Sequence, residues 1–440
     1  MKSKTLLVFI AVLSLTLFGC PPKESGAGGG DAGGEILVGE YGSMTGGEAT
    51  FGQSTHNGII MALDEINASG GVAGRKIKVL TEDDQSKQEE AANAVTKLIS
   101  QNNVVAVLGE VASSNSLAAA PICQANKVPM ITPSSTNPEV TKKGEYIFRV
   151  CFIDPYQGPM LAQFVRNDLK MTRAAILRDV KSDYSMGLSE FFKQRFLQLG
   201  GQIVADQSYS KGDSDFKAQL TALNAAKPQV IFVPGYYTEI GQIAIQARDL
   251  GMNQPFVGGD GWESPRLIEI GGKALEGSFY SNHYHADDPA PAVRSFVEKY
   301  RERFGDKPDS LAALGYDSMK VLAEAMKRAK KIEGPAIRDE IAKTNGFQGV
   351  TGTITLGEDR NPVNKKLVVL EIKNGQLALR ATIDPGASTT SAPSTPISAV
   401  QGSGTTTGGP APNSELQAPT STVASPPAAG KQPTTTQPKQ

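Results

Sequence analysis

Eight residues with hydroxyl, aromatic or carboxylate side chains follow short apolar segments, in loops that precede helix-like stretches. They are Phe51, Ser113, Ser134, Ser135, Thr136, Tyr184, Tyr236 and Asp260. The loops of the first half supply neutral hydroxyls beside exposed backbone amides, which suit a carboxylate. The loops of the second half supply aromatic walls and one carboxylate, which suit a cationic amine. These residue types favour a binding site, because they include no nucleophile–base pair.

Each of these residues, taken alone, has a plainer interpretation. Ser113 could serve only as a helix N-cap, because Ser is a preferred capping residue. Phe51 could be a core residue, Tyr236 could pack at a rim, and Asp260 among glycines could be a turn residue. The binding hypothesis therefore depends on the whole set, because ligands of open parallel sheets bind beyond the carboxyl ends of the strands.

The chain lacks the sequence motifs of common hydrolases, nucleotidases and metalloproteases. It contains no G-x-S-x-G, no Walker loop, no H-E-x-x-H and only three histidines. His283 and His285 would lie on the same face of an extended segment and could form a metal pair, but no third ligand is evident. We therefore expect no enzyme activity, no metal site and no cofactor.

Two further pairs of residues allow more than one interpretation. Asp83 and Asp84 follow an apolar segment, and we expect them to be solvated or to cap the next helix rather than to act as acid and base. Cys123 and Cys151 could form a disulfide in an oxidising compartment, or both could be small buried hydrophobic residues. The sequence leaves the state of the two cysteines open.

Composition and charge exclude several classes of protein. The 440 residues include 44 Lys and Arg against 45 Asp and Glu, which gives no global electrostatic basis for binding nucleic acid or a membrane surface. Three cysteines exclude a disulfide-rich scaffold and a cysteine-rich zinc module. With 39% hydrophobic residues the chain can bury a substantial core, and it is long enough for two or three domains.

The two ends of the chain differ in composition from the part between them. Residues 1–19 carry two lysines and then a short apolar run, which is the pattern of a signal peptide. The residues up to Cys20 resemble a bacterial lipobox and predict a lipid anchor there; the alternative is an ordinary secretory peptide with an incidental cysteine. The Gly-rich segment 20–34 is expected to be a flexible tether. Residues 385–440, rich in Thr, Ser and Pro and without an aromatic residue, are expected to be disordered.

Between these ends, residues 35–384 alternate strand-like and helix-like segments. The apolar run 36–38 is followed by a helical stripe over 52–66, which ends in the C-cap pattern 67–71. Asn374–Gly375 indicates a hairpin near the end. Short apolar strands with helices between them predict parallel sheets covered on both faces, so the fold class is α/β. Because one sheet of so many strands would be unusual, we expect two doubly wound lobes.

The loops and their order resemble those of the leucine/isoleucine/valine-binding proteins of ABC importers. The similar segments are Val38–Gly39, Gly42–Gly46, Phe51–Gly52, Asn57–Gly58, Asp64–Asn67, Thr136–Glu139 and Gly235–Tyr237. The similarity covers nearly all of 35–384, and it depends on order and spacing more than on any single motif.

This resemblance implies the type I periplasmic-binding fold, in which two α/β lobes are joined by three crossovers that form a hinge. The crossovers are expected near residues 153, 282 and 350. Lobe 1 would then contain 35–153 and 283–350, and lobe 2 would contain 154–282 and 351–384.

The resemblance also implies which residues hold each end of a ligand. Ser113 and Thr136 match positions that hold the α-carboxylate, with backbone groups of Ser134 and Ser135 nearby. Asp260 matches the acidic position that takes the α-ammonium.

Three aromatic residues complete the site that the resemblance implies. Tyr236 would help Asp260 with the ammonium, Tyr184 matches an aromatic residue of the opposite lobe, and Phe51 would cover the ligand side chain. The sequence departs from the family in two ways: Asp260 is shorter than the Glu of the best-known members, and the second apolar wall has no secure match. The preference for a ligand side chain is therefore open.

The function implied is that of an extracytoplasmic solute-binding lipoprotein, which delivers a branched-chain or other apolar amino acid to the permease of an ABC importer. Binding would close the lobes about the hinge. We expect a monomer that contacts the membrane through its anchor only, without nucleic acid or cofactor. The alternatives are a ligand-sensing receptor module of the same fold and a binder of a simple amide or related small molecule.

Overall fold

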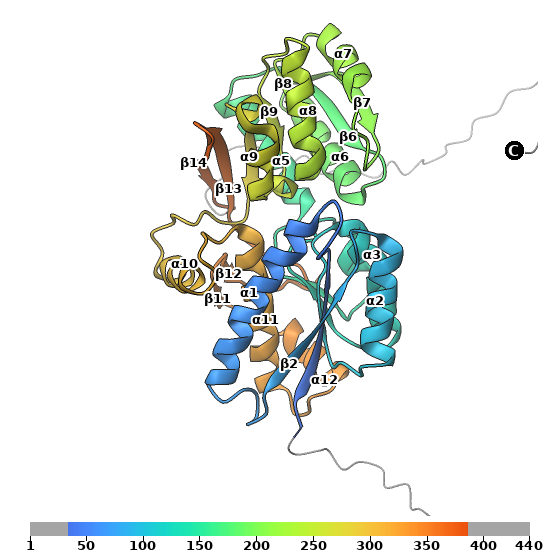
Figure 1. Cartoon of the computed structure of the whole chain (residues 1–440), viewed down its shortest axis with the longest axis vertical. Helices are drawn as coiled ribbons and strands as arrows, with labels where there is room; N and C mark the ends of the chain where they lie inside the picture. Colours follow the sequence, from blue (N-terminus) through green and yellow to red (C-terminus); the bar gives the residue numbers. More distant parts are fainter. Residues whose placement is uncertain (1–33, 386–440) are drawn as a thin grey trace, which may run out of the picture. The chain divides into compact units, whose positions relative to one another are not determined.

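The computed structural model describes residues 34–385, which form two large sheets with helices packed against them (Figure 1). The signal peptide, the lipidation site expected at Cys20 and the tail expected to be disordered lie outside the described residues, apart from residue 385 itself. In 34–385, no helix is both long and apolar enough to cross a membrane.

The first sheet contains five parallel strands in the order β2-β1-β3-β4-β5. The strands are β1 (Ile36–Gly42), β2 (Ile77–Asp83), β3 (Val107–Leu108), β4 (Met130–Thr132) and β5 (Ile147–Arg149). Successive side chains of a strand point to opposite faces, so Val107 and Met130 lie in one hydrophobic cluster, whereas Leu108 and Ile131 lie in another. Both faces of this sheet are therefore buried, as the short apolar strands predict.

Helices from distant parts of the sequence cover the two faces of the first sheet (Figure 1). The helices α1 (Ala49–Ala68), α11 (Ser310–Arg328) and α12 (Gly334–Ala342) pack on one face, and α2 (Gln88–Ser100) and α3 (Ser113–Ala125) pack on the other. The helices α1 and α11 approach closely because Gly58 and Gly315 have no side chain. A Cβ on Gly58 would lie 1.9 Å from the carbonyl oxygen of Ala312, and one on Gly315 would lie 2.4 Å from that of Thr55. This packing joins the N-terminal part and 310–342 in lobe 1.

The second sheet contains seven strands in the order β14-β13-β10-β9-β8-β6-β7. They are β6 (Arg173–Asp179), β7 (Gln202–Tyr209), β8 (Val230–Phe232), β9 (Phe256–Gly258), β10 (Phe279–Asn282), β13 (Leu367–Lys373) and β14 (Gln376–Ile383). The strands β6 to β10 are parallel, and β13 and β14 are added in antiparallel orientation. Asn374 and Gly375 join them with positive φ angles of 54° and 70°, which confirms the expected hairpin.

The helices of lobe 2 pack around the sheet; the first precedes β6, and the others lie between the parallel strands in sequence. They are α5 (Asp154–Gln163), α6 (Asp183–Gln198), α7 (Lys217–Ala225), α8 (Tyr237–Asp249) and α9 (Pro265–Gly271). Two further helices, α4 (Glu139–Lys142) and α10 (Pro291–Phe304), belong to lobe 1. The alternation of strands and helices gives the α/β architecture that the sequence predicts.

Three segments connect the two lobes. Residues 150–153 lead from β5 to α5, and 283–290 lead from β10 to α10. The third segment differs from the expectation, which placed the crossover near 350 and 351–384 in lobe 2. The strand β12 (Gly352–Ile354) pairs with β11 (Phe347–Gly349), and Ile354 is buried in the hydrophobic cluster of α1 and α11. The chain therefore leaves lobe 1 only between residue 354 and β13, because burial of Ile354 holds β12 on lobe 1.

Candidate functional site

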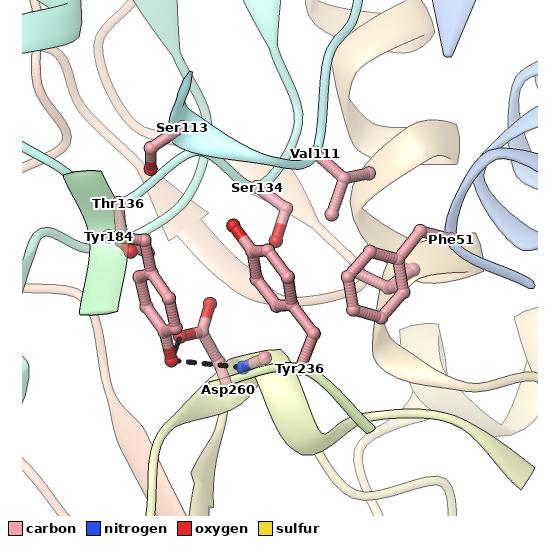
Figure 2. A pocket seen from close by; sticks show the side chains of 10 residues that line it. Phe51, Val111, Ser113, Ser134, Thr136, Tyr184, Tyr236 and Asp260 are labelled. Atoms are coloured by element: carbon pink, nitrogen blue, oxygen red, sulfur yellow. Dashed lines mark hydrogen bonds between the residues drawn. The ribbon is translucent and has the colours of Figure 1, made fainter. Parts of the chain in front are cut away.

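The loops at the carboxyl ends of strands from both sheets enclose one small cavity (Figure 2). Seven of the eight expected residues line it: Phe51, Ser113, Ser134, Thr136, Tyr184, Tyr236 and Asp260. Residues separated by up to about two hundred positions thus meet at one place, because parallel strands of a lobe present their carboxyl ends at the same edge.

Hydroxyl groups form the part of the cavity that lobe 1 supplies. Ser113 begins α3, and its Oγ accepts a hydrogen bond from the backbone N–H of Asn137 at 3.2 Å, so the Ser113 hydroxyl proton is free to bond a ligand. The Thr136 Oγ1 is buried and has no hydrogen-bond partner within the described chain. Ser113 is not the N-cap of α3, because that position belongs to Ala112. This end of the cavity is rich in donors, and none of the lobe 1 residues that line it is acidic.

Arg149 fixes the loop that contains Ser134 and Thr136. Its buried guanidinium donates to the carbonyl oxygen of Asn137 at 2.9 Å and also to the carbonyl oxygen of Ser135. Arg149 thereby restrains the backbone of this loop, from which Ser134 and Thr136 line the cavity. The positive charge of Arg149 also favours an anion in front of the loop.

Ser135 is the expected site residue that does not line the cavity. Its Oγ lies 2.7 Å from Ser116 Oγ and donates to the carbonyl oxygen of Glu110 at 2.9 Å, and its backbone N–H donates to Thr132 Oγ1 at 2.9 Å. The side chain, the N–H and the carbonyl of Ser135 are all bonded inside lobe 1, so Ser135 supports the loop from the lobe 1 side. Backbone groups of Ser135 were expected near the ligand carboxylate; in the structure its N–H and its carbonyl are instead bonded to Thr132 and Arg149.

Asp260 supplies the negative charge of the cavity, from lobe 2. Its Oδ1 accepts a hydrogen bond from the Tyr184 hydroxyl at 2.9 Å, and its Oδ2 lies 3.0 Å from Nε2 of His283. Burial and then the charge of Asp260 raise the pKa of the Tyr184 hydroxyl well above its usual value, so Tyr184 stays protonated and donates. Figure 2 shows the Tyr184 hydroxyl between the Asp260 carboxylate and the backbone N–H of Gly261.

Aromatic and aliphatic side chains form the rest of the wall. The Phe51 ring packs edge-on against Tyr236, with ring centres 5.3 Å apart, and Tyr236 stacks on Tyr184 at 5.5 Å. Val111 and Leu311 also line the cavity, and neither was among the residues expected from the sequence. Leu311 lies in the first turn of α11, about fifty residues after Asp260, and no local pattern marks it as a cavity residue.

Direct contacts join the two lobes around the cavity. Ser114 Oγ donates to Asp183 Oδ2 at 2.7 Å, and Asn137 Nδ2 donates to the carbonyl oxygen of Asp183 at 2.8 Å. On another side, Thr50 Oγ1 lies 3.0 Å from Ser264 Oγ. The structure is thus in a closed form, in which a ligand would be surrounded by both lobes.

The remaining polar candidates serve the framework around the cavity. Asp83 accepts hydrogen bonds from the backbone N–H groups of Met44 and Thr45, and Asp84 accepts one from Ser43 Oγ at 2.9 Å. These carboxylates therefore hold the loop between β1 and α1; they do not cap α2, whose N-cap is Lys87.

The histidines and cysteines also have framework surroundings. Within the described part of the chain no group of three His, Cys, Asp or Glu side chains could hold a metal ion, and His283 faces Asp260 instead. Cys123 and Cys151 are both free and buried in different hydrophobic clusters, so they do not form the disulfide that the sequence left open.

Comparison with known proteins agrees with this architecture. Residues 35–376 match the family model described as "Periplasmic binding protein". The chain belongs to this family. A leucine-specific-binding protein of Salmonella typhimurium is 30% identical over 358 residues, which are 81% of this chain and 93% of that protein. An "Amino acid binding protein" of Pseudomonas aeruginosa is 30% identical over 320 residues, 72% of this chain and 85% of the relative.

Solved structures of the family show the same fold. The crystal structure of a leucine-binding protein from Thermotoga maritima is 42% identical, with a TM-score of 0.77, and the match covers 80% of this chain and 99% of that one. A branched-chain amino acid transporter substrate-binding protein from Streptococcus pneumoniae, in complex with isoleucine, is 33% identical with a TM-score of 0.76; this match covers 80% of this chain and all of that one. The resemblance to leucine/isoleucine/valine-binding proteins and the type I periplasmic-binding fold are therefore confirmed.

Proposed function

We propose that this protein binds an α-amino acid with an apolar side chain between its lobes and delivers it to the permease of an ABC importer. The observation that carries this proposal is the distribution of charge in the cavity. Uncharged hydroxyl donors come from one lobe, and a single buried carboxylate comes from the other. A zwitterion satisfies both ends, whereas a simple anion would leave Asp260 without a cationic partner.

The carboxylate of the ligand would bind at Ser113, Ser134 and Thr136. The hydroxyls of Ser113 and Thr136 are free to donate, and α3 begins at Ser113 with its N-terminal amides beside the cavity. Donors that are already oriented lose little freedom when an anion binds, and a helix N-terminus adds a favourable dipole. Arg149, behind the loop, strengthens the attraction without contacting the ligand.

The ammonium of the ligand would bind at Asp260, beside the stacked rings of Tyr184 and Tyr236. Each Asp260 oxygen accepts one hydrogen bond in the structure and retains capacity for another. Because Asp260 is buried, its charge is weakly screened, and an ammonium ion that enters the closed cavity gains a strong partner.

The side chain of the ligand would lie against Phe51, Val111 and Leu311. These walls are apolar, as expected where an aliphatic side chain is buried. The names of the relatives point in the same direction: the Thermotoga protein is a leucine-binding protein, and the Streptococcus structure contains isoleucine. We therefore propose leucine, isoleucine or valine as the first ligands to test.

The cellular setting follows from the same proposal. The Streptococcus relative is named as the substrate-binding protein of a transporter, and we propose the same role, outside the cytoplasm, for this chain. A lipid anchor at Cys20 would keep the protein beside its permease, and the Gly-rich segment 20–34 would allow it to move there. We propose that it acts as a monomer.

A thermal-shift screen tests the proposal. Leucine, isoleucine and valine are compared with leucinamide, which lacks the carboxylate, and with 4-methylpentanoate, which lacks the ammonium. A ligand at 100 times its dissociation constant stabilises the folded form by about 2.7 kcal/mol, which raises the melting temperature measurably. We expect a shift with the amino acids and a much smaller one with either analogue. An equal shift with leucinamide, or no shift with any of the twenty amino acids, would refute the proposal.

A further inference from the structure

The carboxylate of Asp260 has a second partner that does not line the cavity. His283 follows directly after β10, on the second segment that crosses between the lobes, and its side chain is completely buried. Its Nε2 lies 3.0 Å from Asp260 Oδ2, on the oxygen that Tyr184 leaves free. The carboxylate is therefore fixed from two directions: Tyr184 holds one oxygen from within the cavity, and His283 holds the other from behind.

The surroundings of His283 determine which form of the imidazole is present. The ring stacks on Phe152 of the first crossing segment, with ring centres 3.8 Å apart and planes inclined by 23°. Its Nδ1 is buried and has no hydrogen-bond partner in the described residues. Because the carboxylate can only accept, Nε2 carries the proton and Nδ1 carries none. Burial lowers the pKa of His283, in agreement with a neutral ring.

A neutral donor has a specific advantage at this place. The other charged groups that affect His283 are Asp260 itself and Lys365, whose positive charge opposes protonation of the ring. A protonated imidazole, or a lysine in its place, would cancel the negative charge of Asp260 and leave none for a cationic ligand. A neutral Nε2–H orients the carboxylate and preserves its charge.

We infer that His283 is a positioning residue, which selects ligands with an ammonium group by holding Asp260 in its binding orientation without neutralising it. This inference rests on the proposed function, because it names the residue that supports the ammonium end of that site. His283 touches Asp260 and Phe152, two residues that belong to lobe 2 and to a hinge segment. It contacts no ligand by itself.

Two substitutions of His283 distinguish this role from a purely structural one. His283→Phe retains a ring that can stack on Phe152 but removes the donor; His283→Gln retains an N–H donor of similar reach. Isothermal calorimetry with leucine and with 4-methylpentanoate measures each. We expect His283→Phe to weaken leucine binding by about 10- to 100-fold, since a hydrogen bond to a charged group is lost, and to change binding of 4-methylpentanoate by less than about threefold. His283→Gln should bind leucine within about fivefold of the wild type.

Two results for His283→Phe would contradict the inference. Equal losses for leucine and for 4-methylpentanoate in His283→Phe would overturn the inference, because a general structural defect weakens both ligands alike. Leucine binding at wild-type affinity by the same variant would overturn it as well.

A measurement without ligand keeps the inference testable if the proposed function fails. Nitrogen-15 NMR of the imidazole in the ligand-free protein should show a protonated Nε2, an unprotonated Nδ1 and no titration of the ring between pH 6 and 8, against an ordinary pKa of about 6.5. A ring that titrates like an exposed histidine would refute the positioning role, whichever ligand the protein binds. If the wild type binds no amino acid but the NMR result is as expected, only the proposed function fails.

Discussion

Lys211 Nζ lies 2.7 Å from Glu48 Oε2, and this ion pair joins lobe 2 to lobe 1 beside the N-terminus of α1. The same ammonium donates to the carbonyl oxygen of Ser86 at 2.8 Å. The Glu48 side chain is only 2% exposed, so water screens the pair weakly on that side. Because the two residues belong to different lobes, their contact stabilises the closed form and contributes nothing to an open one.

Lys211→Met should therefore shift the balance towards the open form. The loss of this partly buried pair is expected to cost about 1 to 2 kcal/mol of closure, or about 5- to 30-fold in apparent ligand affinity. Small-angle X-ray scattering without ligand should show a larger radius of gyration, and calorimetry should show the weaker binding. Lys181→Met, on the same lobe, removes an exposed lysine without an ion pair in the described residues and serves as the matched control. Similar affinities for the two variants would contradict the assignment.

Asp260→Asn keeps the shape of the cavity but removes its negative charge. The ligand ammonium would then be buried without a counter-charge, which is expected to cost about 2 to 5 kcal/mol, or roughly 30- to several-thousand-fold in affinity. Ser113→Ala should cost less, because it removes one neutral hydroxyl while the other donors remain. Calorimetry with the ligand found by the screen measures the affinity of both variants. Wild-type affinity of Asp260→Asn would contradict the proposal that Asp260 binds the ligand ammonium.

Leu311 should determine which ligand side chains fit. Leu311→Ala opens the apolar wall in the first turn of α11, so contacts with a branched aliphatic ligand are lost, at about 1 to 3 kcal/mol, or about 5- to 150-fold. The same variant should gain affinity for phenylalanine relative to leucine. The check is the ratio of the two dissociation constants. An unchanged ratio would show that Leu311 does not limit ligand size.

Binding should weaken as the pH rises from about 5 to neutrality. Glu263 of lobe 2 accepts a hydrogen bond at 3.1 Å from the backbone N–H of Ser310 of lobe 1, and burial and then the charge of Asp309 raise the pKa of Glu263 to about 7. In an open form its pKa would return towards its usual value of about 4.3, so closure takes up a proton between these values. The closed form is thus favoured at pH 5, and this contribution declines as the pH rises and is lost by about pH 7.

Affinity measured between pH 5.5 and 8.5 tests this linkage. Between pH 5.5 and about 7 the affinity should fall by at most tenfold per pH unit, as expected for one proton, and it should level off above about pH 7. Glu263→Gln should flatten the profile, because its side chain cannot ionise. A profile that keeps its slope in the variant would assign the pH dependence to another group.

Cys20 is predicted to carry the lipid anchor. Cys20→Ser removes the sulfur that a diacylglyceryl group would modify, so the protein should be released in soluble form or remain unprocessed. Fractionation of cells and mass spectrometry of the mature N-terminus measure both results. An unmodified mature start at another residue would show that the segment is an ordinary secretory signal.

The apolar patterns of the sequence correctly predicted the α/β fold and most of the elements that carry the site. A strand or an amphipathic helix is specified by neighbours within a few residues, so β1 with α1 and the Asn374–Gly375 hairpin can be recognised locally. Small hydroxyl residues and glycines at the ends of strands marked the cavity for the same reason. Seven of the eight expected residues meet there because the strands that precede them lie in parallel sheets.

The tertiary structure alone decided the direction and the partners of individual side chains. Ser135 points into lobe 1 although it adjoins two cavity residues, and Leu311 reaches the cavity because Gly58 and Gly315 allow α11 to approach α1. His283 lies behind Asp260 because β9 and β10 are neighbours in the sheet. Each of these contacts is formed between atoms of segments that are distant in sequence. Their geometry depends on how close two packed elements come, and no local pattern of residue types encodes that distance.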